Sequence, residues 1–199
     1  TEQIIKTVDE IESIKIENNR LSVITKNLFK VLGQKKTILS GCGGSVSFID
    51  TGKLPSVKSD FSIDSPAISS MIKMVLESEL HNKTGGIHVV ALVSAEGIIS
   101  RSEDIGRHNA LDRVIGHALR RNIDLSCTYA ICSGRISSEM VRKCLIAGIP
   151  LIVSRGATTT LAIDIAKKTG LCVIGFVRGS RMNVYTHPER VKGIPSLPE

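Results

Sequence analysis

Two groups of residues in this 199-residue chain have types and spacings that could do chemistry. The first is a lone cysteine, Cys42, in the run Thr37-Ile-Leu-Ser-Gly-Cys-Gly-Gly-Ser45. Glycines on both sides predict an exposed thiol on a mobile loop rather than a thiol in a core. Such a thiol could carry sulfur as a persulfide, because it could reach both a donor and an acceptor. An inert loop cysteine remains the alternative.

The second group is a set of arginines that each follow an apolar, strand-like run and precede a predicted helix. They stand in Gly106-Arg-His108, Ser133-Gly-Arg135 and Ser154-Arg-Gly156. Unpaired N–H groups at a helix start carry partial positive charge, so cations placed there indicate a nearby anion. Three such turns favour a ligand with several phosphates, bound by Arg107, His108, Arg135 and Arg155. For any single turn, an ordinary ion-pairing surface arginine is the alternative.

Two histidines could also belong to a site. His108 and Asp112 are four residues apart on one predicted helix face, so the carboxylate could orient the imidazole. A capping or surface pair is an equal alternative. His88 lies in the otherwise apolar run 87–93. It is either a core histidine with a hydrogen-bond partner or a residue of the site.

The periodicity of apolar residues predicts the elements that must position these side chains. A hairpin is predicted at 11–25 and a loop at 51–64. From Ser65 the predicted order is helix 65–85, strands 87–93 and 98–102, helix 107–121, strand 127–132, helix 137–147, strand 150–153, helix 157–168, strand 171–177 and a short last strand at 184–186. Strands separated by helices favour a largely parallel sheet. Ligands bind such sheets at the carboxyl ends of strands, where the arginines fall.

We therefore expect an α/β fold, with a three-layer α/β/α domain at 61–199 and a partial, β-rich N-terminal region at 1–60 that holds the Cys42 loop. The element order is that of the cytidine-deaminase-like fold. Zinc deaminases need His-x-Glu at one helix start and Pro-Cys-x-x-Cys at the next. The helix starts here read Gly106-Arg-His-Asn and Arg135-Ile-Ser-Ser. Because these ligands are missing, we expect no zinc.

Composition limits the class of partner. The formal net charge of +7 points to an anionic partner. The chain has no tryptophan, two tyrosines and four phenylalanines, which argues against nucleic-acid binding through stacked bases. No apolar run is long enough to span a membrane and no signal peptide is evident, so we expect no membrane partner and a cytoplasmic location. The first residue is threonine, which suggests a fragment or a processed chain.

Five cysteines, an odd number, fit reduced thiols better than a disulfide framework. Four of them lie on apolar patterns and are predicted to be small core residues: Cys127, Cys132, Cys144 and Cys172. Cys42 is the exception.

Four segments stand out together: Thr84-Gly-Gly-Ile-His88, Glu103-Asp-Ile-Gly-Arg-His-Asn-Ala-Leu-Asp112, Ser133-Gly-Arg-Ile-Ser137 with Glu139-Met-Val, and Gly175-Phe-Val-Arg-Gly179. Through them the chain, from about 9 to 190, resembles the FdhD/NarQ family of formate dehydrogenase accessory sulfurtransferases. The resemblance implies a sulfur carrier that receives sulfur from a cysteine desulfurase. It would pass the sulfur to the molybdenum or tungsten bis-guanine-dinucleotide cofactor before that cofactor enters formate dehydrogenase.

By position, the resemblance implies that Cys42 is the persulfide cysteine. It also implies a cofactor-binding stretch made of Phe176, Val177, Arg178, Gly179, Ser180 and Arg181, and a homodimer. Ser45 stands where many relatives have a second loop cysteine, so a relay between two thiols is not expected. The family also usually has more β-rich sequence ahead of this start.

Two rival hypotheses remain open. One is a guanine-nucleotide-binding or cofactor-binding chaperone with no covalent sulfur chemistry, which would act equally well after Cys42→Ala. The other is a basic nucleic-acid-binding module, indicated by charge alone and recognisable by a steep salt dependence.

Overall fold

The computed structural model describes residues 5, 7–26 and 54–194, and its contacts divide the chain into two units, Thr1–Ile38 and Leu39–Glu199. In the first unit a short 3-10 helix, η1 (Val8–Glu10), precedes an antiparallel hairpin of β1 (Ile11–Glu17) and β2 (Arg20–Thr25). Asn18 in the turn has a φ of 51°, a conformation that asparagine tolerates and that two-residue hairpin turns require. The predicted hairpin is confirmed.

The second unit is built on a six-stranded sheet with the order β5-β4-β6-β7-β8-β9. Its strands are β4 (His88–Ser94), β5 (Gly97–Asp104), β6 (Tyr129–Cys132), β7 (Leu151–Ser154), β8 (Cys172–Arg178) and β9 (Arg181–Thr186). Strands β6, β7 and β8 run parallel, whereas β4, β5 and β9 pair antiparallel with their neighbours. The expectation of a largely parallel sheet therefore holds only at its centre, because β5 and β9 return through tight turns without crossover helices.

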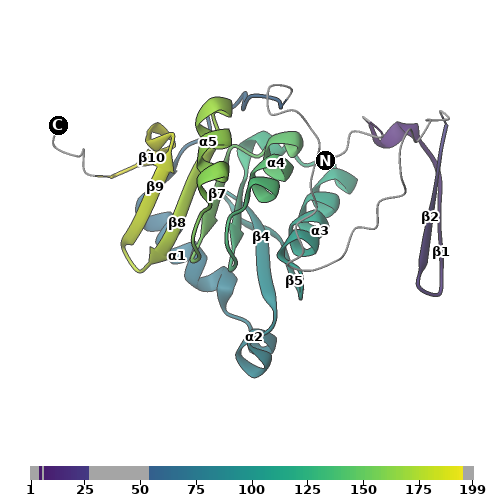
Figure 1. Ribbon diagram of the computed structural model, residues 1–199, viewed down its shortest axis with the longest axis horizontal. Helices are drawn as coiled ribbons and strands as arrows, with labels where there is room; N and C mark the ends of the chain where they lie inside the picture. The colour runs from purple at the N-terminus through teal and green to yellow at the C-terminus, as the bar shows by residue number, and fades with distance from the viewer. Residues whose placement is uncertain (1–4, 6, 27–53, 195–199) are drawn as a thin grey trace. The chain divides into compact units, whose positions relative to one another are not determined.

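The strands read as continuous apolar runs because both faces of the sheet are covered. Val90 and Leu92 of β4 face one core, together with helices α3 (Arg107–Arg120), α4 (Ser138–Ala147) and α5 (Thr160–Thr169). Val89, Ala91 and Val93 face the other core, against α1 (Ser65–Leu76) (Figure 1). This alternation produces three layers, so the predicted α/β fold is confirmed.

The single helix predicted at 65–85 is in fact two helices. Helix α1 ends at Leu76, and Ser78 then begins α2 (Glu79–Thr84) by accepting a hydrogen bond from the His81 amide at 2.9 Å. Figure 1 shows α2 projecting beyond the end of β4. The break matters for the candidate site, because it places a separate short polar helix, α2, at the end of the sheet where β4 begins.

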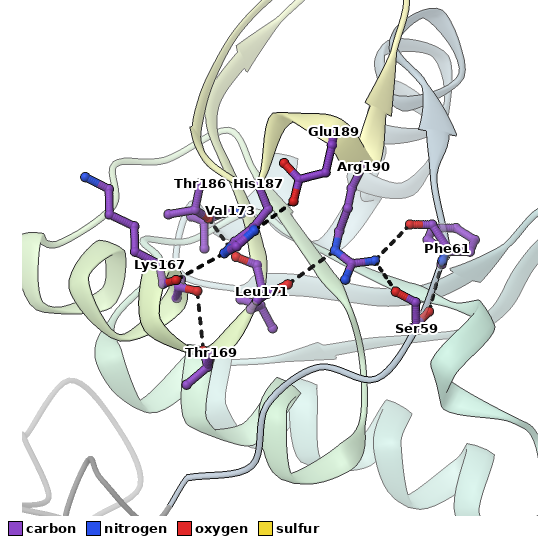
Figure 2. Close-up of polar contacts among 12 residues, drawn as sticks. Ser59, Phe61, Lys167, Thr169, Leu171, Val173, Thr186, His187, Glu189 and Arg190 are labelled. Carbon is purple, nitrogen blue, oxygen red and sulfur yellow. Dashed lines mark hydrogen bonds and ion pairs between the residues drawn. The ribbon is translucent and has the colours of Figure 1, made fainter.

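Arg190, in the 3-10 helix η4 (Pro188–Arg190), ties the segment before α1 to the sheet (Figure 2). Its Nη1 donates to the carbonyl oxygens of Ser59 at 2.6 Å and Phe61 at 3.1 Å. Its Nε donates to the Gly170 carbonyl oxygen at 3.2 Å. The short strands β3 (Ile63–Asp64) and β10 (Val191–Lys192) then pair in parallel. The N-terminal approach to α1 and the C-terminal segment therefore hold each other in place.

The expected N-terminal region extends to residue 60, and two of its residues, Leu54 and Val57, pack against the core of the second unit. The domain boundary at 60/61 stays a prediction. No helix among the described residues is both long and apolar enough to cross a bilayer.

Candidate functional site

The carboxyl ends of β6, β7 and β8 meet at one edge of the sheet, where the turns pack backbone against backbone. A Cβ added at Gly156 would lie 3.1 Å from both the amide nitrogen of Arg135 and the carbonyl carbon of Gly134. A Cβ at Gly175 would lie 2.9 Å from Thr158 Oγ1 and 3.3 Å from the Gly156 carbonyl oxygen. Glycine at these positions permits the close approach.

Hydrogen bonds lock the same turns together. The buried hydroxyl of Ser154 donates to the Gly134 carbonyl oxygen at 2.6 Å and accepts from the Gly156 amide at 2.8 Å. The Phe176 amide donates to the Gly156 carbonyl oxygen at 3.1 Å. The backbone that carries the turn arginines is therefore fixed, although their side chains reach outward.

A pocket of about 460 Å³ opens between α1, α2 and the ends of β7 and β8. Its lining residues are Ser69, Ile72, Lys73, Leu76, Glu77, Asn82, Arg155, Val177, Arg178 and Gly179. Four of the residues predicted to bind a ligand, Arg155, Val177, Arg178 and Gly179, are thus brought together. The volume falls in the usual range for small-molecule sites, roughly 300–1,000 Å³.

The polar side chains of this pocket are not used for internal bonding. Within the described part of the chain, no hydrogen bond or ion pair engages the side chains of Lys73, Glu77, Asn82, Arg155 and Arg178. Three of these are cations and one is a carboxylate. The excess positive charge favours an anionic ligand, and arginines suit phosphates in particular because their planar fork can donate two parallel hydrogen bonds.

The remaining residues of the predicted stretch lie outside the pocket lining. Phe176 has a φ of 53° at a β-bulge in β8 and is 40% exposed. A bulky residue in the left-handed region costs about 1–3 kcal/mol, a strain that concentrates at functional sites. Ser180, in the turn between β8 and β9, and Arg181, the first residue of β9, are both exposed. The structure therefore divides the stretch between the pocket and its rim.

A second cluster lies around the start of α3. Arg107 is only 9% exposed, whereas Arg135 is exposed. Burial lowers the pKa of His88, and the positive charges of Arg107, His81 and Arg135 lower it further. His88 is half-buried, and its Nδ1 lies 3.3 Å from Ser133 Oγ, so it has a polar partner; its membership of a binding site stays a prediction. Arg107 and Arg135 therefore lie near one another, but neither lines the pocket that contains Arg155.

His108 pairs with a residue that sequence spacing did not indicate. Its Nε2 lies 3.6 Å from Glu139 Oε2, whereas Asp112 forms an ion pair with Lys143. Burial lowers the pKa of His108, as does the charge of Arg107, and Glu139 opposes both effects. The pairing of His108 with Asp112 is therefore replaced by contacts between α3 and α4.

Much of the segment 103–112 has a structural role. Asp104 Oδ1 accepts hydrogen bonds from the Gly106 amide at 2.8 Å and from Asn109 Nδ2 at 3.1 Å. Its other oxygen, Oδ2, lies 3.2 Å from Arg113 Nη2. Asp104 thus holds the turn from β5 into α3, which fixes where Arg107 and His108 begin the helix.

Four of the five cysteines lie in the described part of the chain, and they differ in whether they are buried or exposed. Cys42 lies outside the described residues. Cys132, Cys144 and Cys172 are buried, as predicted. Cys127 is exposed, so its assignment to the core was wrong. Strand β6 starts at Tyr129 instead of at 127, and Cys127 ends a 3-10 helix, η3 (Leu125–Cys127).

Lys73, Glu77 and Asn82 supply one wall of the pocket, and no pattern in the sequence indicated this. Lys73 and Glu77 lie in the predicted helix 65–85, and polar residues of an amphipathic helix ordinarily face solvent. Only the tertiary fold, which brings α1 and α2 against the ends of β7 and β8, reveals them.

A sequence model described as the FdhD/NarQ family matches residues 1–192. A relative from Thermoplasma volcanium, named sulfur carrier protein FdhD, is 39% identical over 92% of this chain and 71% of its own length. One of the same name from Wolinella succinogenes is 37% identical over 96% of this chain and 70% of its own. The crystal structure of a putative formate dehydrogenase accessory protein from Desulfotalea psychrophila aligns with a TM-score of 0.74 and 28% identity, over 94% of this chain and 73% of that one.

Proposed function

The chain belongs to the FdhD/NarQ family, and we propose that it is a sulfur carrier that serves formate dehydrogenase. In this proposal Cys42 accepts sulfur from a cysteine desulfurase as a persulfide. The protein then passes that sulfur to the molybdenum or tungsten bis-guanine-dinucleotide cofactor, which is its substrate. The protein is thus a sulfurtransferase.

The observation that carries the proposal is the agreement among relatives that match almost the whole chain. Proteins from Thermoplasma volcanium and Wolinella succinogenes, at 39% and 37% identity, are both named as sulfur carriers. The solved relative from Desulfotalea psychrophila, named as a formate dehydrogenase accessory protein, supports the target enzyme.

The chemistry of the site edge supports the proposed substrate. A bis-guanine-dinucleotide carries two pyrophosphates, which need several cations in fixed positions. Arg155 and Arg178 line the pocket together with Lys73, and Arg107 and Arg135 stand at neighbouring turns. The residues present therefore fit a ligand with separated phosphate groups better than a compact anion.

Sulfur loading follows the ordinary chemistry of persulfides. The thiolate of Cys42 attacks the outer sulfur of the persulfide on the desulfurase. A new sulfur–sulfur bond forms on Cys42, the bond in the donor breaks, and the donor cysteine leaves as a thiolate. One thiol suffices for this step, which agrees with the serine at position 45.

The test is direct observation of the loaded protein. Wild type, Cys42→Ala and Cys127→Ala are incubated with a cysteine desulfurase and cysteine, and intact and peptide mass spectra are recorded. We expect one added sulfur on the Cys42 peptide in wild type and in Cys127→Ala, and none on that peptide in Cys42→Ala. Cys127→Ala is the control because Cys127 is also an exposed thiol. A folded protein that gains no sulfur on Cys42 would leave the non-covalent cofactor chaperone as the better account.

A further inference from the structure

The pocket beside β7 and β8 contains one carboxylate among its cations. Lys73, Arg155 and Arg178 give it positive charge, and Glu77 is its single acidic lining residue. A carboxylate repels phosphate groups, so it weakens a site that binds phosphate alone. Its presence suits a ligand that offers phosphate at one end and hydrogen-bond donors at the other.

Glu77 stands on a backbone that is anchored from outside the pocket. Arg101 Nη2 donates to the Glu77 carbonyl oxygen at 2.6 Å, and Arg101 Nε donates to the Val75 carbonyl oxygen at 2.8 Å. Arg101 also forms an ion pair with Glu103, with Nη1 2.8 Å from Oε1 of the carboxylate. The end of α1 is therefore fixed, while the Glu77 carboxylate makes no hydrogen bond or ion pair with any described residue.

Asn82 reaches the same pocket from a second anchored element. The buried Ser78 begins α2 and accepts from the His81 amide, which places Asn82 in the first turns of that helix. The pocket thus offers a carboxylate acceptor, an amide that can donate or accept, and the ammonium donor of Lys73.

Guanine matches this set of groups. Its N1–H and exocyclic amino group are adjacent donors that can bond the two oxygens of one carboxylate, and its O6 is an acceptor. Adenine places an acceptor at N1 and would turn a lone pair toward that carboxylate. A carboxylate in the base subsite therefore discriminates between the two purines, because the mismatch leaves both polar groups without a partner.

We propose that Glu77 reads the guanine base in this pocket, with Asn82 or Lys73 bonding O6 and with Arg155 and Arg178 bonding the phosphates. The inference rests on the proposed function in taking a guanine dinucleotide as the ligand. It adds that one guanine nucleotide end of that ligand sits between α1, α2 and the end of β8. It also makes Glu77 the residue that determines specificity.

The test measures binding of GDP, ADP and IDP to the full chain by titration calorimetry. IDP has the same ring as GDP but lacks the exocyclic amino group. We expect wild type to bind GDP more tightly than either ADP or IDP. In Glu77→Gln we expect GDP affinity to fall roughly ten- to hundredfold, the range for a hydrogen bond to a charged group, while the preference over IDP disappears.

Glu79→Gln is the matched control. Glu79 lies two residues further along, is exposed, pairs with Lys83 and does not line the pocket, so the same loss of charge there should leave all three affinities unchanged. If Glu77→Gln lowers GDP and IDP binding equally, or changes neither, the role of Glu77 is refuted and the proposed function stands. If wild type binds none of the nucleotides, the proposed cofactor recognition itself fails, and the inference fails with it.

Discussion

The imidazole ring of His88 lies directly against the backbone of Gly134. A Cβ added at Gly134 would come within 2.9 Å of both Cε1 and Nδ1 of that ring, and within 3.1 Å of Cδ of Arg107. The glycine of the turn Ser133-Gly-Arg135 therefore sets the position of a histidine that lies much earlier in the chain, and of the buried Arg107 beside it. Gly134, which precedes one of the turn arginines, therefore has a packing role.

Gly134→Ala should destabilise the protein by about 1–3 kcal/mol, because the added methyl group must displace His88 or Arg107 in a packed region. Gly116→Ala is the control, since Gly116 lies inside α3 and a Cβ there would meet no atom within 4 Å. That control should be stabilising by roughly 0.5–1 kcal/mol, because alanine is the better helix former. Urea denaturation measures both changes. Equal stability of Gly134→Ala and wild type would show that the close contact is absent.

Stability should fall as the pH drops below neutrality. The pKa values of His88 and His108 are lowered from 6.5, first by burial and then by the charge of Arg107. Below about pH 6.5 the unfolded chain therefore binds protons that the folded chain does not, so the free energy of unfolding decreases. The decrease levels off once the pH is below the folded pKa values. Urea midpoints at pH 7.5 and 5.5 measure it.

His88→Gln is the variant that isolates this effect, since glutamine does not titrate. The loss of stability between pH 7.5 and 5.5 should be smaller in His88→Gln than in wild type. The same loss in both proteins would contradict the assignment to His88.

Arg190→Ala should release the segment before α1. The substitution removes three hydrogen bonds to the carbonyl oxygens of Ser59, Phe61 and Gly170 (Figure 2). A loss of roughly 1.5–3 kcal/mol is expected from one charged donor group leaving its acceptors. Hydrogen exchange should quicken at the amide of Phe61. The exposed Arg120, at the end of α3, supplies the control Arg120→Ala, which should leave this exchange unchanged.

Unchanged exchange at Phe61 in Arg190→Ala would show that Arg190 does not hold this segment.

The sequence predicted those elements of the fold that depend on short-range patterns of apolar residues. Apolar runs of the right length marked β4, β6, β7 and β8, and the periodic stripe 111, 114, 115 and 118 marked α3. The direction of β4 was not predictable, because a strand covered on both faces has the same continuous apolar sequence whether the neighbouring strand runs parallel or antiparallel. The break at Ser78 was also missed, since serine inside a helical pattern becomes a cap only when the chain turns there.

The residue types of the candidate site were predictable from the sequence, but which of these residues lie together was not. Turn arginines at 107, 135 and 155 indicated an anionic ligand, and the family resemblance added Arg178, but the four side chains fall into two groups. Arg155 and Arg178 share a pocket with α1 and α2, whereas Arg107 packs beside His88. Sequence spacing carries no information on which helix covers which strand end, so the sequence alone could not place Glu77 in one pocket with Arg155 and Arg178.

The four described cysteines should differ in how fast they react with iodoacetamide. Burial raises the pKa of Cys132 to about 11 and that of Cys172 to about 12, and it raises the pKa of Cys144 as well. Because the thiolate is the reactive form, these three should resist iodoacetamide in the native protein at pH 7.5 and react after denaturation. The exposed Cys127 should react at once. Peptide mapping that found Cys172 labelled as fast as Cys127 would contradict the burial.

If sulfur reaches formate dehydrogenase through Cys42, the activity of that enzyme in cells should depend on this cysteine. A strain that lacks its own member of the family is supplied with wild type or with Cys42→Ala, and formate dehydrogenase activity is measured in extracts. Equal expression and equal GDP binding by the two proteins provide the control for folding. We expect activity with wild type and none above background with Cys42→Ala. Equal activity with both would contradict covalent sulfur transfer and leave a cofactor-binding chaperone in its place.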